Sequence, residues 1–223
     1  ARREQLAGAE AALLQVAGAI SSEQLAAMNP QNVSNSLWAL SELGLRPPHL
    51  VARLMQAALW LAPAMGPQAI SNTALALAKL GCSDGRLFAA LVSAASDRAE
   101  QFSPQDVCNL CWAVAVADQQ QLSGAAAALC KQLAEQRWEA ASAEEHRQLH
   151  QVHLWLLDHQ PGAGGLAGAL SAARLRQCAE AWLRQRPSQR RSDFEQQVFA
   201  SAQRLPGLAG RSQEARTQDG AFS

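Results

Sequence analysis

Three segments decide the fold: NPQNVSNSLWALSELG at residues 29–44, GPQAISNTALALAKLG at 66–81 and SPQDVCNLCWAVAVAD at 103–118. Each contains a Pro-Gln pair, and the pairs begin at Pro30, Pro67 and Pro104, which sets a repeat length of 37 residues. The match continues with a β-branched residue, an asparagine and an alanine at equal distances after each proline. Self-similarity at a fixed period, without insertions, is the signature of a repeat protein.

Each segment predicts an α-helix of about fourteen residues. Asn29, Gly66 and Ser103 occupy the position of a helix N-cap, and a proline at the first helical position needs no amide donor. Apolar residues then recur at spacings of three and four, which places them on one face of the helix. In the first two copies this stripe consists of Val33, Leu37, Leu40 and Leu43, and of Ile70, Ala74, Leu77 and Leu80.

The end of the first helix and the start of a second are also marked. Gly44 and Gly81 predict helix ends, whereas Asp118 at the same place in the third copy predicts a weaker one. A second helical pattern follows in each copy, over about 48–61, 84–99 and 123–135. One helical hairpin cannot bury both of its faces, so the units must stack. The sequence therefore predicts an all-α protein, an α-solenoid of stacked helical hairpins with a 37-residue repeat.

Because the sequence begins at Ala1 rather than Met, we expect it to be a fragment. The segment 144–159 is a degenerate fourth copy of the first helix, with Leu149, Val152 and Leu156 as its apolar stripe. The expected organisation is a partial preceding repeat at 1–28, a repeat array at 29–160, a Gly-rich loop at 161–171, an Arg-rich helical segment at 172–210 and a disordered tail at 211–223.

The overall composition excludes several classes of protein. Nineteen Lys and Arg residues balance nineteen Asp and Glu residues, so the chain is neither a strongly basic nucleic-acid binder nor an acidic tail protein. No apolar stretch is long enough to predict a membrane span. An odd number of cysteines, five, favours a reducing compartment over a disulfide-stapled secreted domain. Basic residues gather in the C-terminal segment from Ala172 onward, where nine arginines accompany five acidic residues.

The three segments resemble the octotricopeptide repeat of green-algal organelle proteins and, more broadly, the helical array of FAST-kinase-like proteins that carry a C-terminal RAP domain. The resemblance rests on the P-Q-x-[VI]-x-N core at Pro30, Pro67 and Pro104 and covers about 110 residues firmly. The stretch SDFEQQVFASAQRL from Ser192 resembles the family more loosely. The sequence after it lacks a β-rich apolar pattern, so the RAP domain is expected to be missing or truncated, and any RNA-cleaving module would lie outside this fragment.

The resemblance implies binding of single-stranded RNA in a chloroplast or mitochondrion, with about one nucleotide for each unit, in transcript processing, stability or translation. The implied partners are this RNA and other proteins of an organelle ribonucleoprotein, without a membrane, a small-molecule substrate or a cofactor. The first-helix positions that vary between copies, together with a recurrent asparagine and two nearby cations, are the candidate RNA-binding residues. They are Asn32, Asn35, Ser36, Asn72, Thr73, Asp106, Asn109, Lys79 and Arg46.

The recurrent asparagine, at Asn35, Asn72 and Asn109, has two interpretations that the sequence leaves equally open. Its amide suits the edge of a nucleobase, and it equally suits a structural ladder, meaning a row of hydrogen bonds between neighbouring units. For Trp38 and Trp112 we favour packing between repeats over base stacking, because the middle copy has leucine at this position. The near-neutral charge of the array also leaves open a second function, a protein-interaction scaffold that binds a peptide or a helix on its concave face.

Other combinations of residues do not predict a catalytic or metal site. Cys108 and Cys111 have the spacing of a zinc-binding pair, but the nearest histidine, His146, lies 35 residues beyond, and both cysteines replace small or apolar residues of the other copies. We therefore expect both cysteines in the core. The Gly-rich stretch follows a helix rather than a strand, which argues against a phosphate-binding loop. An enzyme is the least favoured class.

Overall fold

The computed structural model describes residues 27–159, 162 and 164–184, together with residues 11, 15, 23 and 24. Most of the predicted preceding repeat at 1–28, the part of the Arg-rich segment beyond Arg184 and the predicted tail at 211–223 lie outside these described residues. Within them the protein consists of helices and loops, with no strand. The helices are α3 (Pro30–Leu43), α4 (Pro48–Leu61), α5 (Pro67–Lys79), α6 (Gly85–Ser96), α7 (Pro104–Val116), α8 (Ser123–Gln136), α9 (Ala143–His159) and α10 (Ala172–Arg184).

The first helix of each predicted unit begins at its proline, as expected. Asn29 caps α3 by accepting a hydrogen bond from the Asn32 amide at 2.8 Å. Ser103 and Asp106 form a reciprocal capping box at the start of α7. Gly66 precedes α5 without a side-chain cap. The shared start of the three helices therefore depends on proline and on the extended backbone before it rather than on one cap residue.

All three first helices end within one residue of the same place in the repeat. Gly44 and Gly81 have φ values of 66° and 65°, in the left-handed region that favours glycine. Asp118 takes up the same conformation, with φ 51°, and its carboxylate accepts a hydrogen bond from Trp155 Nε1 at 3.0 Å. Aspartate tolerates this region better than most residues. The third helix thus ends where the glycines end the others, although the sequence predicted a weaker stop.

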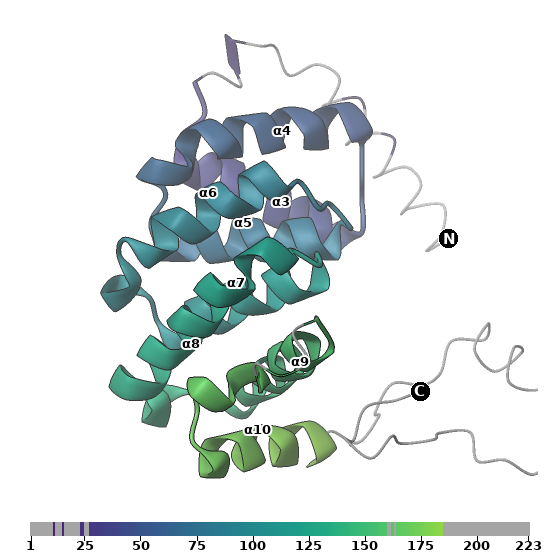
Figure 1. Ribbon diagram of the computed structural model, residues 1–223. Coiled ribbons are helices and arrows are strands. Elements are labelled where there is room, and N and C mark those ends of the chain that lie inside the picture. The colour runs from purple at the N-terminus through teal and green to yellow at the C-terminus, as the bar shows by residue number, and fades with distance from the viewer. Residues whose placement is uncertain are drawn as a thin grey trace, which may run out of the picture.

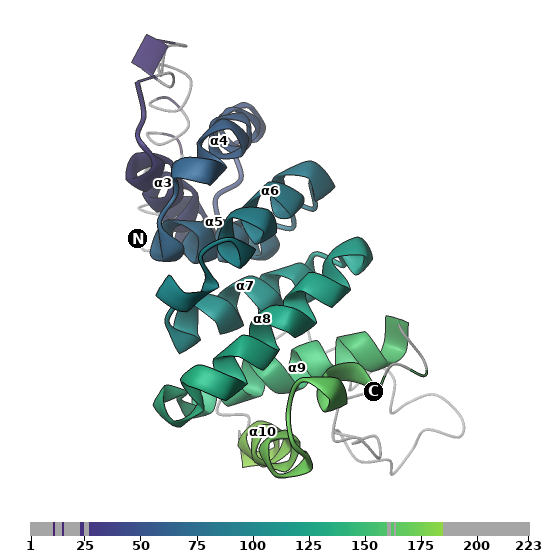
Figure 2. The same ribbon diagram turned by 60° about the vertical axis from the view of Figure 1, so that its left-hand side comes forward.

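The helices form two rows, which Figures 1 and 2 show from two directions. In the first row, α3 packs against α5, α5 against α7 and α7 against α9. In the second row, α4 packs against α6 and α6 against α8, while each of the first three hairpins also closes on itself. We call α3, α5, α7 and α9 the first row. Consecutive units are therefore side by side, and every inner unit buries both of its flanks.

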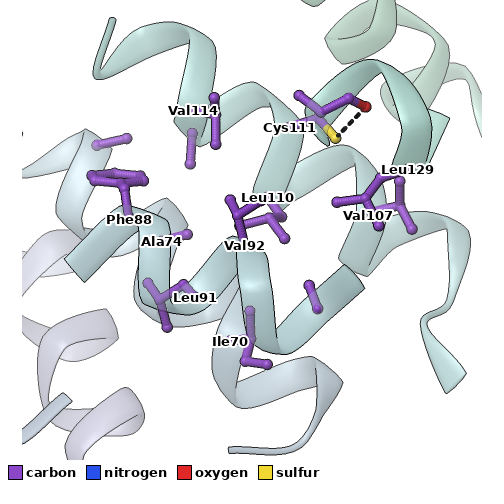
Figure 3. Packing of buried hydrophobic residues seen from close by; sticks show 14 of the residues in the cluster. Ile70, Ala74, Phe88, Leu91, Val92, Val107, Leu110, Cys111, Val114 and Leu129 are labelled. Carbon is purple, nitrogen blue, oxygen red and sulfur yellow. Dashed lines mark hydrogen bonds between the residues drawn. The ribbon is translucent and has the colours of Figure 1, made fainter. Parts of the chain in front are cut away.

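The core lies between the rows, and Figure 3 shows its centre. Ile70, Leu91 and Leu110 come from three different helices and have no more than a trace of exposed surface. Fully burying a side chain of this size stabilises the fold by about 1.5–3 kcal/mol. The predicted apolar stripe is buried throughout α5 and at Val33, Leu37 and Leu40 of α3, but Leu43 is 58% exposed. The prediction for Leu43 was wrong: Leu43 is the last residue of α3 and faces solvent, whereas Leu80 at the same place in the second copy is buried.

The predicted core role of the cysteines is confirmed for both members of the CxxC pair. Cys108 and Cys111 are fully buried, and Cys111 Sγ lies 3.5 Å from the Ala126 carbonyl oxygen. Burial raises the pKa of the Cys108 thiol well above its ordinary value and that of Cys178 to about 12. All five cysteines are free thiols. At neutral pH the Cys108 and Cys178 thiols stay protonated, which suits packing rather than metal binding or nucleophilic chemistry.

The fourth unit departs from the pattern of the other three. Its first helix, α9, begins at Ala143, one residue before the predicted start and 39 rather than 37 residues after Pro104. The predicted Gly-rich loop after α9 contains a short 3₁₀ helix, Gly165–Gly168, that packs on α8 and α9. The 13-residue helix α10 follows and packs against α9. The segment predicted as a loop, 161–171, thus includes a turn of 3₁₀ helix. The described part of the predicted Arg-rich helical segment is α10.

His153 of α9 holds this short connection in place. Its Nδ1 accepts a hydrogen bond from the Leu166 amide at 2.9 Å, and a Cβ on Gly165 would come within 2.5 Å of the same ring nitrogen. Burial lowers the pKa of His153 below its ordinary value, and the nearby His150 acts in the same direction. The folded state therefore favours the neutral imidazole.

We predict that the free energy of unfolding is highest above about pH 6.5 and falls as the pH drops through the lowered pKa of His153, because the unfolded chain takes up the proton first. Urea unfolding followed by circular dichroism between pH 7.5 and 5.0 measures this slope. His153→Gln, which keeps an acceptor without a titrating ring, should reduce the slope, and the exposed-site control His49→Gln should not. An unchanged slope in His153→Gln contradicts the assignment.

Candidate nucleic-acid interface

The candidate residues lie mostly on the outward face of the first row. Counting from the first residue of each helix, positions 2, 3, 6, 9 and 13 form this face in α3, and they remain the most accessible positions in α5. In α7 positions 2 and 13 stay exposed, but position 6, Asn109, is only 9% exposed. The face is therefore most open over α3 and α5.

Side chains at the same position in neighbouring helices meet across this face. At position 13, Lys79 Nζ lies 2.6 Å from Glu42 Oε1. At position 6, Gln148 Nε2 donates to Asn109 Oδ1 at 2.9 Å. At position 9, Trp112 Nε1 donates to Gln151 Oε1. The 39-residue offset of α9 is what brings Gln148 and Gln151 into this register.

The two interpretations of the recurrent asparagine separate along the chain. Asn109 takes part in the ladder, since its amide oxygen pairs with the next unit. Among the described residues, no hydrogen bond involves the side chain of Asn35 or Asn72. The ladder interpretation thus describes Asn109 in the third copy. It does not describe Asn35 and Asn72, whose side-chain amides have no hydrogen-bond partner among the described residues.

Asn35 and Asn72 line one groove between the N-terminal parts of α3 and α5. The groove has a volume of about 270 Å³ and is moderately open to solvent. Its other polar walls include Gln31 and Gln68, the position-2 residues of the same two helices. The complete lining is Pro30, Gln31, Ser34, Asn35, Gly66, Pro67, Gln68, Ala69 and Asn72. We call this the amide groove.

The remaining polar candidates have different surroundings. Asn32 is exposed beside the groove, and Ser36 is half-buried. Thr73 has no exposed surface and its Oγ1 lies 3.9 Å from Met65 Sδ. Asp106 joins two units, because it accepts a hydrogen bond from Ser71 Oγ at 2.8 Å besides closing the capping box. The hydroxyl of Thr73 and the carboxylate of Asp106 are thus occupied within the protein.

The two candidate cations also bind within the protein. Lys79 pairs with Glu42, as described above. An Arg46 guanidinium nitrogen donates to the Gly81 carbonyl oxygen at 3.1 Å. Both contacts join the first unit to the second, so they tie the array together. Neither cation lines the amide groove, whose polar side chains are all uncharged.

Sequence reasoning missed Gln31 and Gln68. The signal was present, because the glutamine of the Pro-Gln pair recurs in all three copies, but it was used to find the repeat rather than to place a side chain. It also missed Gln148 and Gln151, since a period of 37 does not bring them into register with Asn109 and Trp112. The exposure of Trp38, 45%, likewise differs from the expected packing between repeats.

Comparison with known proteins adds no assignment. No protein-family model matches the chain, and no curated protein matches it. Among the described residues, no three His, Cys, Asp or Glu side chains converge in a way that could hold a metal ion. In the same part of the chain, no helix is long and apolar enough to cross a membrane.

The split between Asn109 and the other two asparagines leads to a stability prediction. Asn109→Ala should lower the free energy of unfolding by about 1 kcal/mol, because it removes a partly buried hydrogen bond and leaves the Gln148 amide without its acceptor. Asn35→Ala and Asn72→Ala should each change it by less than about 0.5 kcal/mol. Chemical denaturation of the three variants tests this, and equal losses in all three would contradict the split.

Proposed function

We propose that this protein binds single-stranded RNA across the outward face of its first row, and that the two rows form an α-solenoid in which successive units contact successive nucleotides. The observation that carries the proposal is the amide groove, where Asn35 and Asn72 of consecutive units are brought together and their amides make no hydrogen bond to any described residue. The octotricopeptide resemblance supports it independently. The proposed setting, a chloroplast or mitochondrion and its ribonucleoproteins, rests on that resemblance alone.

The chemistry of the groove suits the edge of an unstacked nucleobase. Each amide side chain offers two donors and an acceptor, and bases in single strands can present their hydrogen-bonding edges to a protein. A base inserted between α3 and α5 would meet Gln31 and Asn35 on one side and Gln68 and Asn72 on the other. Because these pairs are identical in the two units, discrimination between units must come from a position that differs, and position 3 differs as Asn32 and Ala69.

Electrostatics limit the strength of the complex. The lining of the amide groove contains no Lys or Arg, and Lys79 and Arg46 have partners within the protein. The N-terminal ends of α3 and α5 supply partial positive charge only. We therefore expect few phosphate contacts, about two at most, which corresponds to a slope of about −1.4 in a plot of log affinity against log salt. The proposal assigns no catalytic step and no cofactor to this chain.

We predict that Asn35→Ala combined with Asn72→Ala weakens binding to a pool of single-stranded RNA by about tenfold or more without a loss of helicity. Two lost base contacts at about 1 kcal/mol each account for this size of effect. Fluorescence anisotropy at several salt concentrations measures it, with duplex RNA and DNA as competitors. The matched control is Gln56→Ala with Gln136→Ala, which removes two exposed amides from α4 and α8.

The result also separates RNA binding from the protein-scaffold alternative. Equal affinity of the double variant and the control contradicts the amide groove as the RNA site. No binding of any single-stranded pool by the full chain below about 10 µM at low salt, where even nonspecific contacts register, would favour a protein-interaction scaffold.

A further inference from the structure

A second groove lies toward the other end of the first row, between α7, α9 and α10. It has a volume of about 440 Å³, within the range of small-ligand sites. Three of the six tryptophans, Trp112, Trp155 and Trp182, line it. The remaining lining residues are Ala115, Val116, Gln151 and Leu154. We call it the tryptophan groove. It lies on the same outward face of the first row as the amide groove but shares none of its lining residues.

The indole nitrogens of two of these tryptophans are already bound within the protein. Trp112 Nε1 donates to Gln151, and Trp155 Nε1 donates to Asp118 Oδ1 at 3.0 Å. These bonds fix the orientation of the two indoles and use their only donors. What the tryptophans offer to a ligand is therefore ring surface, whose faces carry negative electrostatic potential.

The lining itself carries no charged side chain, and the carboxylate of Asp118 is joined to it through the indole of Trp155. Asp118 lies where α7 ends, directly beside Trp155, and the indole hydrogen bond holds the pKa of its carboxyl below the ordinary value, so it is ionised at neutral pH. His159 Nε2 lies 3.2 Å from the same carboxylate, and its Nδ1 lies 3.8 Å from Asp158 Oδ2 on the same helix. Gln120 Nε2 donates to the other Asp118 oxygen at 3.2 Å. The lining contains no Lys or Arg that could pair with a phosphate. A nucleotide would bring negative charge toward Asp118, whereas a cation would meet a complementary site.

We propose that the tryptophan groove binds the guanidinium group of an arginine in a peptide segment of a partner protein. A guanidinium is flat, weakly hydrated and always charged, so it can stack on an indole while it faces a carboxylate. The protein already uses this pairing once, because the Arg174 guanidinium carbon lies 5.0 Å from the centre of the Trp138 ring. The proposal does not depend on RNA binding.

The test is a titration of the full chain, labelled with ¹⁵N in its tryptophan indoles, with a capped Gly-Arg-Gly-Arg-Gly peptide. Single Trp→Phe variants assign the six indole resonances. The expected result is a shift of Trp112, Trp155 and Trp182, while Trp38, Trp60 and Trp138 stay unchanged as internal controls. The same peptide with citrulline, a neutral analogue of the same shape, should bind at least fivefold more weakly. Equal binding of both peptides, or shifts spread over all six indoles, overturns the proposal.

Two variants locate the site. Asp118→Asn should weaken the arginine peptide at least threefold, because asparagine tolerates the left-handed backbone and still accepts the Trp155 hydrogen bond but carries no charge. Trp112→Leu, the residue found at this position in the second copy, should weaken it at least fivefold, and Trp38→Leu should not. If both variants, Asp118→Asn and Trp112→Leu, bind the arginine peptide as tightly as the unchanged protein does, the proposal is overturned. This holds even if one of the two variants is less stable.

Two other occupants are distinguished in the same experiment. If adenosine monophosphate shifts the three groove indoles and the arginine peptide does not, the groove is a base-stacking site and the proposal fails. A triple variant replaces Arg186, Arg190 and Arg191 by Gln. If its three groove indole resonances differ from those of the unchanged protein before any peptide is added, the occupant is the chain's own basic segment, and a separate partner is excluded. The control for the triple variant is Arg204→Gln with Arg211→Gln and Arg216→Gln, which removes the same charge farther along the chain.

Discussion

Packing of each first-row helix against the next is the contact on which the rest of the structure depends. It brings residues about 37 positions apart in sequence side by side, so one position in the repeat becomes a line of neighbouring side chains in space. The Asn109–Gln148 and Lys79–Glu42 pairs are direct results of this register. Both grooves also arise from it, because each is a gap between neighbouring helices: one where the helices begin, and one toward their ends.

Much of the array was predictable because its signals are local. Proline at the first helical position and a glycine or aspartate at the helix end specify the bounds of α3, α5 and α7 from a few residues each. The 37-residue period then specifies which helices are neighbours. The fourth unit was predicted less well. Its first helix starts where Ser142 and Glu145 hydrogen-bond to each other's backbone amides rather than at a proline. A short 3₁₀ helix, held by the tertiary contact of His153, then separates α9 from α10.

The candidate site was predictable only in part, for a related reason. Periodicity identified the outward face and thus Asn35 and Asn72, but burial also depends on how far each helix overlaps its neighbours. Thr73 is adjacent to Asn72 in sequence, but the helix turns by about 100° per residue, and this places Thr73 in the core. Asp106 and Asn109 were equally plausible contacts from the sequence, yet hydrogen bonds to neighbouring units occupy both. Arg46 and Lys79 were expected to contact RNA, yet each binds a neighbouring unit, Arg46 at the Gly81 carbonyl oxygen and Lys79 at the Glu42 carboxylate.

Ultraviolet crosslinking of single-stranded RNA to the full chain, followed by mass spectrometry of the crosslinked peptides, locates the RNA on the protein. If RNA binds at the amide groove, crosslinks form in the peptides that contain the starts of α3 and α5, residues 30–36 and 67–73, and unlabelled single strands but not duplex compete for them. Crosslinks confined to the C-terminal arginine-rich segment, or absent from these two helix starts despite binding, would contradict binding at this groove.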